Sequence, residues 1–345
     1  MTSPRASRHL RLIHHALLYT TKCLRVFLFR LSSLRPFSSL GLLTHSLSPS
    51  ASTLPRKGDD DFRALIPRGA WDSHMHVLDP RFPLDAAAVY QPAHFHTSPD
   101  ARTFEHDVAG LDGVVIVQPS IYGHDNACTL SALAALGGPA RARAVVSFDP
   151  TATSQETLAE WHALGVRGEL EATIREYAGA VRPLGWVLQI YASLPTIAKL
   201  EPLLLDGAEQ LGVRVCIDHM GHPDLKASRY SETADPYTIP GFASLVRLLQ
   251  SGNTWTKLSA AYRFSASEDG FSDAAPVAKE LLRVAGLSRV VFATDWPHTR
   301  FEGLDIRPWI RTVLYDLCQR DEALIERVFR GNAEELWSPA LPTEG

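Results

Sequence analysis

Short hydrophobic runs alternate with longer amphipathic stretches from residue 58 onwards. Several of the short runs are almost continuously apolar, such as Val-Val-Ile-Val at 114–117 and Val-Val-Phe-Ala at 290–293. Such runs are typical of parallel strands that are buried on both faces. We predict eight strands, at residues 71–77, 113–120, 142–149, 165–170, 186–191, 213–220, 254–260 and 289–296.

The stretches between these strands have the apolar spacing of helices, and most of them end at a glycine. We predict helices at 126–136, 154–164, 196–211, 241–250 and 275–285. Asn332, followed three residues later by Glu335, predicts an N-cap and its capping partner for a last helix that ends near Trp337.

The spacing of the strands predicts the fold class. Strand starts lie 21 to 42 residues apart, which suits βα units, and eight such units fit the length of the chain after residue 58. A doubly wound open sheet would have a Gly-rich phosphate-binding turn after an early strand, and none is present. We therefore expect an α/β protein with a (β/α)₈ TIM barrel over residues 58–345.

Charge is unevenly distributed along the chain. Nine of the 34 Lys and Arg residues precede Asp59, where there is no Asp or Glu, so the remainder carries 25 basic residues against 38 acidic ones. This acidic balance argues against nucleic acid or an anionic membrane as a partner. A small-molecule substrate is the expected partner, and the sequence does not indicate an oligomeric state.

Residues 1–57 form a leader with a different composition. The stretch is rich in Arg and Ser and is interrupted by charge too often for a comfortable membrane span. This composition predicts a mitochondrial transit peptide. The alternative is a disordered leader without a targeting signal, on a cytoplasmic protein.

His74-Met75-His76 stands at the end of the first predicted strand. Side chains two residues apart on a strand face the same side, so both imidazoles point one way. Such a pair can hold a metal ion or a developing negative charge. The pair alone is weak evidence, because the chain has 14 histidines and a second such pair, His94 and His96, in a Pro-rich segment.

Polar residues follow the other predicted strands at the same end. In a (β/α)₈ barrel the carboxyl ends of all strands meet at one mouth, where active sites form. The residues found there are His74, His76, Ser120, Arg167, Glu169, Gln189, Tyr191, Asp218, His219, Lys257, Ser259, Tyr262, Arg263 and Asp295. Polar side chains thus collect at one end only, as a site requires.

Three motifs in order resemble a known family. His-x-His on the first strand, Asp218-His219-Met220-Gly221 on the sixth and Thr294-Asp295-Trp296-Pro297-His298 on the eighth are similar to those of the amidohydrolase superfamily. More specifically, they resemble the amidohydrolase-2 branch, which contains 2-pyrone-4,6-dicarboxylate lactonase and related sugar-lactone enzymes. The resemblance covers about residues 70 to 337.

The resemblance implies a hydrolase that opens a lactone or related cyclic ester by water attack. It assigns Asp295 as the general base and places His74, His76 and His219 around the substrate carbonyl oxygen. We expect desolvation at the barrel mouth to raise the pKa of Asp295 towards that of a useful base. The candidate substrate contacts are Tyr90, Ser120, Arg167, Tyr191, Arg263 and His298.

Two departures from the family pattern bear on cofactor and substrate. Superfamily members with a firm metal site commonly supply a further ligand on strand four or five, whereas strand five here offers Gln189 and Tyr191. We therefore expect no required cofactor, with Zn²⁺ held by His74, His76 and Asp295, and by Glu169, as the alternative. Acidic Glu169 and Glu171 then replace the basic strand that grips the pyrone dicarboxylate, which makes a dianionic substrate doubtful.

Other functions remain open. The same barrel could be a Zn-dependent amidohydrolase or a decarboxylase. It could also be a catalytically silent binding protein, although such a protein has no reason to keep His74, His76, His219 and Asp295 together. A Ser-nucleophile hydrolase is disfavoured, because no Gly-x-Ser-x-Gly motif occurs.

Overall fold

A computed structural model describes residues 61–164, 166–170, 174–226, 234–267 and 271–337. The predicted leader, 1–57, and the predicted domain boundary after it lie outside the described residues and stay predictions. Within the described part, no helix is long and apolar enough to cross a membrane.

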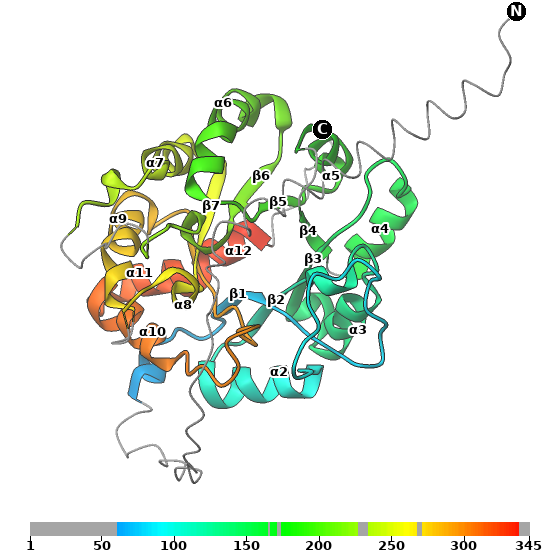
Figure 1. Cartoon of the computed structure of the whole chain (residues 1–345), viewed down its shortest axis with the longest axis horizontal. Helices are drawn as coiled ribbons and strands as arrows, with labels where there is room; N and C mark the ends of the chain where they lie inside the picture. Colours follow the sequence, from blue (N-terminus) through cyan, green and yellow to red (C-terminus); the bar gives the residue numbers. More distant parts are fainter. Residues whose placement is uncertain (1–60, 165, 171–173, 227–233, 268–270, 338–345) are drawn as a thin grey trace, which may run out of the picture. The chain divides into compact units, whose positions relative to one another are not determined.

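Eight parallel strands form one sheet in the order β1 to β8, with helices outside it (Figure 1). The strands are β1 (Trp71–Met75), β2 (Gly113–Val117), β3 (Ala142–Val146), β4 (Val166–Leu170), β5 (Val187–Ile190), β6 (Arg214–Ile217), β7 (Thr254–Leu258) and β8 (Val290–Phe292). Each corresponds to a predicted strand, and the (β/α)₈ barrel is confirmed. Most of the strands end earlier than predicted, because the polar residues at their carboxyl ends turn into loops.

Contacts between β1 and the segment after β8 close the barrel. The amide of His76 donates to Trp296 O at 2.8 Å, and the amide of Asp295 donates to His74 O at 2.9 Å. The buried carboxylate of Asp72 accepts from the amides of His74 and Thr294, both at 3.0 Å. The first and last strands are therefore tied together where the predicted catalytic residues lie.

The helices include every one that the sequence predicts. They are α2 (Ser98–Phe104), α3 (Ala127–Ala135), α4 (Gln155–Leu164), α5 (Ile174–Val181), α6 (Leu194–Leu211), α7 (Phe242–Ser251), α8 (Ala261–Phe264), α9 (Ala275–Ala285), α10 (Arg307–Arg311), α11 (Glu322–Glu326) and α12 (Asn332–Trp337). The prediction missed α2, α5, α8, α10 and α11. Most of these are too short for a helical period to show, and α2, α10 and α11 each continue into a π-helical turn: η3 (Glu105–Ala109), η10 (Thr312–Leu317) and η11 (Arg327–Gly331).

Helix α12 covers the amino-terminal end of the barrel (Figure 1). Its Ala333, Leu336 and Trp337 side chains belong to a buried cluster with eight hydrophobic side chains from seven strands: Trp71, Val115, Val117, Val145, Val187, Cys216, Trp255 and Val291. Arg143 Nε donates to Trp337 O at 3.1 Å, which satisfies a carbonyl at the end of the helix. Side chains of α12 and of the strands therefore fill the amino-terminal end of the barrel.

Asn332 does not cap α12, contrary to the prediction. The chain is already helical through η11, so residue 332 has no free helix start to cap. Its buried amide instead donates to Gly286 O and Val290 O, both at 2.8 Å. Glu335, the predicted capping partner, accepts from Arg327 Nη2 at 2.7 Å. The Asn and Glu thus join the last helix to its neighbours.

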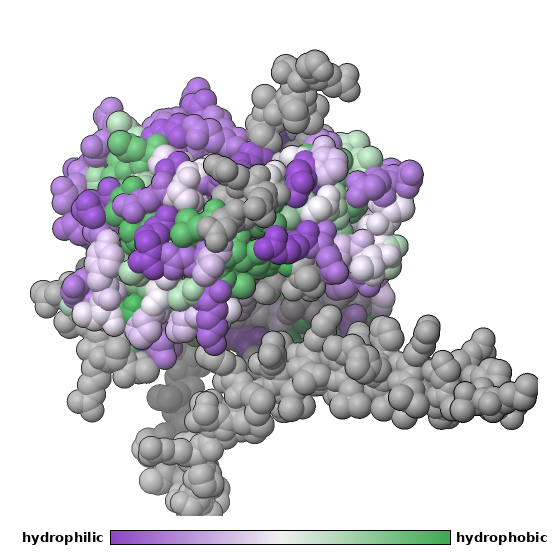
Figure 2. Space-filling view, turned by 90° about the horizontal axis from the view of Figure 1, so that it is seen from above, coloured by the Kyte–Doolittle hydropathy of each residue, from purple (hydrophilic) through white to green (hydrophobic). Residues whose placement is uncertain are grey.

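Hydrophilic residues cover much of the outer surface in Figure 2, with hydrophobic patches between them. Beneath this surface the helices pack on the sheet through one continuous core, which includes Ile116, Leu188, Leu245 and Phe292. This outer core holds the helices in place, so the strand ends that carry the polar residues have fixed positions.

Glu105, in η3, is a buried carboxyl group beside Asp72, and we expect it to make stability depend on pH. Burial and the negative neighbour raise its pKa well above the usual 4.5. The stability that it contributes is therefore complete below pH 4.5 and is lost as pH rises through the folded-state pKa. Glu105→Gln, which needs no proton, should raise the melting temperature at pH 8 by about 2 °C or more.

The gain should shrink at pH 5, and the exposed variant Glu160→Gln should show no such trend in thermal melts. A constant or inverted difference between pH 5 and pH 8 would contradict this interpretation.

Candidate active site

A cavity of about 180 Å³ opens at the carboxyl ends of the strands. His74, at the end of β1, lines it together with three residues that follow β1, β6 and β8: His76, His219 and Asp295. The structure therefore brings together all four predicted catalytic residues. His74, His219 and Asp295 are at most 3% exposed, whereas His76 is 17% exposed.

The loops after β6 and β8 hold two of these residues in an unusual backbone conformation. His219 has φ of 51° and Asp295 has φ of 62°, in the left-handed region that non-glycine residues seldom adopt. Gly221 ends the turn after β6, and a Cβ there would lie 2.5 Å from Leu194 Cδ2. Close packing at Gly221 restricts the turn that carries His219, and uncommon backbone conformations such as those of His219 and Asp295 often occur at functional sites.

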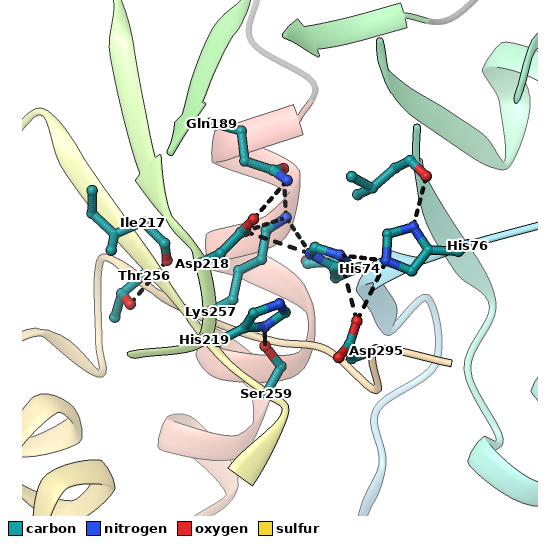
Figure 3. Close-up of polar contacts among 12 residues, drawn as sticks. His74, His76, Gln189, Ile217, Asp218, His219, Thr256, Lys257, Ser259 and Asp295 are labelled. Carbon is teal, nitrogen blue, oxygen red and sulfur yellow. Dashed lines mark hydrogen bonds and ion pairs between the residues drawn. The ribbon is translucent and has the colours of Figure 1, made fainter. Parts of the chain in front are cut away.

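The histidine pair and the aspartate form a tight triangle (Figure 3). His74 Nε2 lies 3.2 Å from His76 Nε2. Asp295 Oδ1 lies 3.6 Å from His74 Nε2 and 3.5 Å from His76 Nε2. These three atoms face one space in the cavity, where a water molecule or a substrate oxygen can contact more than one of them.

Asp295 presents one oxygen to the cavity and uses the other for support. Its Oδ2 accepts from the Tyr262 hydroxyl at 2.6 Å and from Arg263 Nε at 2.7 Å. Its Oδ1 is buried and makes no hydrogen bond to any described residue. The aspartate is thus anchored through Oδ2, while Oδ1 can bind a molecule that enters the cavity.

The pKa of Asp295 does not move in the expected direction. Burial raises it, but the attraction of His219 and Arg263 is stronger in sum and holds the pKa well below the usual value. The expectation of a raised pKa considered desolvation alone and missed the Arg263 guanidinium, which contacts the carboxylate directly. Asp295 is therefore an anion throughout the neutral range.

Two imidazoles at the site stay neutral. Burial and the nearby Lys257 lower the pKa of His74 to about 3. Burial lowers the pKa of His219 to about 4, against the opposing attraction of Asp295. His219 Nδ1 lies 2.7 Å from Ser259 Oγ, and a hydroxyl group can donate or accept, so either tautomer fits.

A polar layer lies directly below the histidines. Lys257 Nζ lies 3.1 Å from His74 Nδ1 and 3.1 Å from Asp218 Oδ1, and Gln189 contacts both Lys257 and Asp218. The sequence placed these residues and Tyr262 at strand ends but gave them no role. The sequence did contain a signal for this layer, namely a lysine within a predicted buried strand. The structure shows that Lys257 is 0% exposed.

The spacing of the triangle agrees with a metal site in part. Ligand atoms on a tetrahedral zinc ion lie about 3.4 Å apart, close to the 3.2, 3.5 and 3.6 Å found between these atoms. His76 Nδ1 lies 2.9 Å from Val117 O, the outer contact typical of a metal-binding histidine. His74 Nδ1 instead faces the Lys257 ammonium, which cannot accept a hydrogen bond from it. The distances fit zinc, but the donor set does not.

The predicted substrate contacts divide into three groups. Tyr90, Ser120, Tyr191 and Arg263 line the cavity. The side chains of Arg167 and Glu169, and all of Glu171, lie outside the described residues. His298 is not among the lining residues, because it packs behind the cavity wall with its ring 5.4 Å from that of Tyr262.

Arg300 also lines the cavity, beside Thr299. Its guanidinium lies over the Tyr90 ring, 4.9 Å from the centroid, and its side chain is exposed. The residue has φ of 70°, so the loop after β8 turns sharply again at this position. An arginine at the rim can meet an anionic group that enters the cavity.

Comparison with known proteins supports the resemblance seen in the sequence. The family model described as amidohydrolase matches residues 71–338. A 4-sulfomuconolactone hydrolase of Hydrogenophaga intermedia is 29% identical over 72% of this chain and 80% of its own. A 2-pyrone-4,6-dicarboxylate hydrolase of Comamonas testosteroni is 29% identical over 68% of this chain and 78% of its own. A D-galactarolactone isomerase of Agrobacterium fabrum is 26% identical over 68% and 78%.

Solved structures share the fold. An apo structure from Agrobacterium tumefaciens has a TM-score of 0.67 and 24% identity, and the match covers 80% of this chain and 97% of that one. An amidohydrolase from Burkholderia multivorans with bound zinc has a TM-score of 0.60 and 19% identity, over 78% and 99%.

The predicted mitochondrial location is wrong. The relatives named above are bacterial enzymes, which carry no mitochondrial import signal. Nothing in the comparisons points to a mitochondrion. The prediction used only the Arg-rich and acid-free composition of residues 1–57, which is not specific to an import signal.

Tyr262→Phe should show how much the anchoring of Asp295 matters. The hydroxyl stabilises the charged carboxylate, so its removal should raise the pKa of Asp295 and move the acid limb of kcat/KM to higher pH. We expect kcat to fall about tenfold. Tyr237→Phe is the matched control, since that hydroxyl also donates to a carboxylate, Glu280 Oε1, far from the cavity. Identical pH profiles for both variants would contradict the role given to Tyr262.

Proposed function

Because this chain belongs to the amidohydrolase family, we propose that it is a hydrolase that opens a lactone ring by attack of water. The observation that carries the proposal is the triangle of His74, His76 and Asp295 at the barrel mouth, with His219 beside it. The names of the relatives, two lactone hydrolases and a lactone isomerase, support the substrate class.

In the proposed first step Asp295 is the general base. A water molecule held by Asp295 Oδ1 attacks the lactone carbonyl carbon and gives its proton to that oxygen. The carbonyl electrons move to oxygen, where His74 Nε2 and His219 can donate hydrogen bonds to the oxyanion. Removal of one such donor typically costs 10²- to 10³-fold in rate. Since Asp295 is a weak base, it must rely on this stabilisation.

In the second step the tetrahedral intermediate collapses. The C=O bond forms again, the bond to the ring oxygen breaks, and the departing oxygen takes the proton from Asp295. The product is a hydroxy acid, and the aspartate returns to its charged form. The anchors on Oδ2, Tyr262 and Arg263, favour this return because they bind the anion more tightly than the neutral acid.

We propose that the substrate carries an anionic group. Arg300 lies at the cavity rim, and Tyr90 and Ser120 place hydroxyl groups near it. The relatives' names include a sulfonated lactone and a pyrone dicarboxylate. A single anionic group is preferred to two, because the sequence has Glu169 within the fourth strand and Glu171 directly after it. The expectation that nucleic acid and membranes are not partners stays a prediction.

Zinc-dependent hydrolysis on the same residues is the second candidate. The spacing within the triangle favours it, and His74, His76 and Asp295 would hold the ion. Bound zinc would polarise the substrate carbonyl. The ammonium of Lys257 at His74 Nδ1 disfavours this candidate. A decarboxylase or a silent binding barrel has no specific observation in its favour.

Asp295→Asn tests the proposed base. The amide cannot take a proton from water, so kcat should fall at least 10³-fold on any lactone that the wild type hydrolyses. The melting temperature should stay within a few degrees, since the new side chain retains an oxygen for Tyr262 and Arg263. A variant with most of its activity would end the assignment.

The same lactone panel, run with and without a chelator, separates the two candidates. Unchanged rates after chelation support hydrolysis without a cofactor, and loss of activity that added Zn²⁺ restores would establish the metal alternative.

Arg300→Gln tests the anionic substrate. We expect KM for a carboxylated lactone to rise about tenfold, with little change for a neutral lactone of similar size. Arg283→Gln, at an exposed arginine on α9, is the control. Equal effects on charged and neutral lactones would contradict the proposed contact.

A further inference from the structure

Lys257 is a fully buried lysine in β7, and its Nζ atom has three polar neighbours. These are Gln189 Oε1 at 2.5 Å, Asp218 Oδ1 at 3.1 Å and His74 Nδ1 at 3.1 Å. An ammonium group has three N–H donors and no acceptor, so Lys257 can only donate. It donates hydrogen bonds to Gln189 Oε1 and His74 Nδ1, whereas its contact with Asp218 Oδ1 is an ion pair without hydrogen-bond geometry (Figure 3).

The neighbouring contacts determine which atom donates in the hydrogen bond between Lys257 Nζ and His74 Nδ1. Gln189 Nε2 donates to Asp218 Oδ2 at 3.0 Å, which turns the amide oxygen of Gln189 towards Lys257. The only competing partner for His74 Nδ1 among these residues is Asp218 Oδ1, at 3.5 Å. That distance is too long for a good hydrogen bond, so His74 Nδ1 accepts from Lys257.

The contacts of one ring nitrogen determine whether the other ring nitrogen carries a proton, in His74 and also in His76. A neutral imidazole carries one proton, so His74 has it on Nε2, facing the cavity. His76 Nδ1 lies 2.9 Å from Val117 O, which can only accept, so His76 has its proton on Nδ1 and a lone pair on Nε2. The 3.2 Å contact between the two Nε2 atoms is then a hydrogen bond from His74 to His76. In this tautomer His76 accepts at Nε2 and does not donate to the oxyanion.

We propose that Lys257 is a positioning residue that fixes His74 as the tautomer with its proton on Nε2. The N–H that donates to His76 also faces the cavity, where a substrate carbonyl oxygen can share it as a second acceptor, and His74 has no lone pair on Nε2 to offer a metal ion. The catalytic consequence rests on the proposed lactone hydrolysis, whereas the tautomer and the metal binding do not.

The barrel floor holds Lys257 in this position. Its Nζ lies 5.3 Å from the centre of the Trp337 ring, which is a cation–π contact. Trp337 Nε1 donates to Ser73 Oγ at 3.1 Å, which fixes the ring below the lysine. The last helix thus supports the residue that orients His74 at the opposite end of the barrel.

The tautomer can be measured directly on the full-length wild-type protein. Long-range ¹H–¹⁵N correlation spectra of ¹⁵N-histidine-labelled protein distinguish protonated from unprotonated ring nitrogens, and the signals lost in His74→Gln assign this residue. We expect a protonated Nε2 and an unprotonated Nδ1 at neutral pH. A proton on Nδ1 would overturn the proposal without bearing on whether the enzyme hydrolyses lactones.

Lys257→Met tests the cause. Without the ammonium, Asp218 Oδ1 is the polar atom that faces His74 Nδ1, so the proton should move to Nδ1 and leave a lone pair on Nε2. The variant should then bind zinc chloride at least tenfold more tightly than the wild type in calorimetry. On a lactone that the wild type hydrolyses, kcat should fall about 100-fold with KM changed less than threefold.

Two further variants are controls. Asp218→Asn removes the buried charge but keeps the lysine, so its His74 tautomer should match the wild type, and Lys199→Met on the surface of α6 should change nothing. Equal zinc affinity in the wild type and Lys257→Met would overturn the proposal. If Lys257→Met does not fold, the wild-type spectrum and Asp218→Asn decide the question.

Discussion

Two backbone hydrogen bonds between β1 and the segment after β8 hold the active site together. They join His76 to Trp296 and Asp295 to His74, and the buried Asp72 binds the same two segments. Closure of the barrel and assembly of the site are therefore one event. A shift of one residue in this register would turn His74 and His76 away from Asp295.

Each carboxylate near the reaction centre has its own cation. Lys257 lies against Asp218 below the histidines, and Arg263 lies against Asp295 beside them. The pairs keep both carboxylates ionised and leave the imidazoles of His74 and His219 neutral. The site therefore acts through the direction of N–H groups and lone pairs, and small changes in hydrogen bonding should matter as much as changes in charge.

Sequence patterns predicted the barrel and the four catalytic candidates, because strand period and strand order determine which residues meet at one mouth. They did not predict the direction of the pKa shift at Asp295, since this depends on Arg263, which lies in α8, the short helix after β7. The role of Lys257 was hidden for a similar reason. A lysine within a strand pattern does not reveal which nitrogen atom it contacts. Asn332 resembled a helix cap because the preceding π-helical turn has no recognisable pattern.

The most direct measurement of the central claim is a crystal structure of the Asp295→Asn variant with a lactone that the wild type hydrolyses. The lactone carbonyl oxygen should lie about 3 Å from His74 Nε2, with a water molecule between the carbonyl carbon and the side chain of residue 295. A lactone bound with its carbonyl directed away from His74 and from residue 295 would contradict the proposed chemistry.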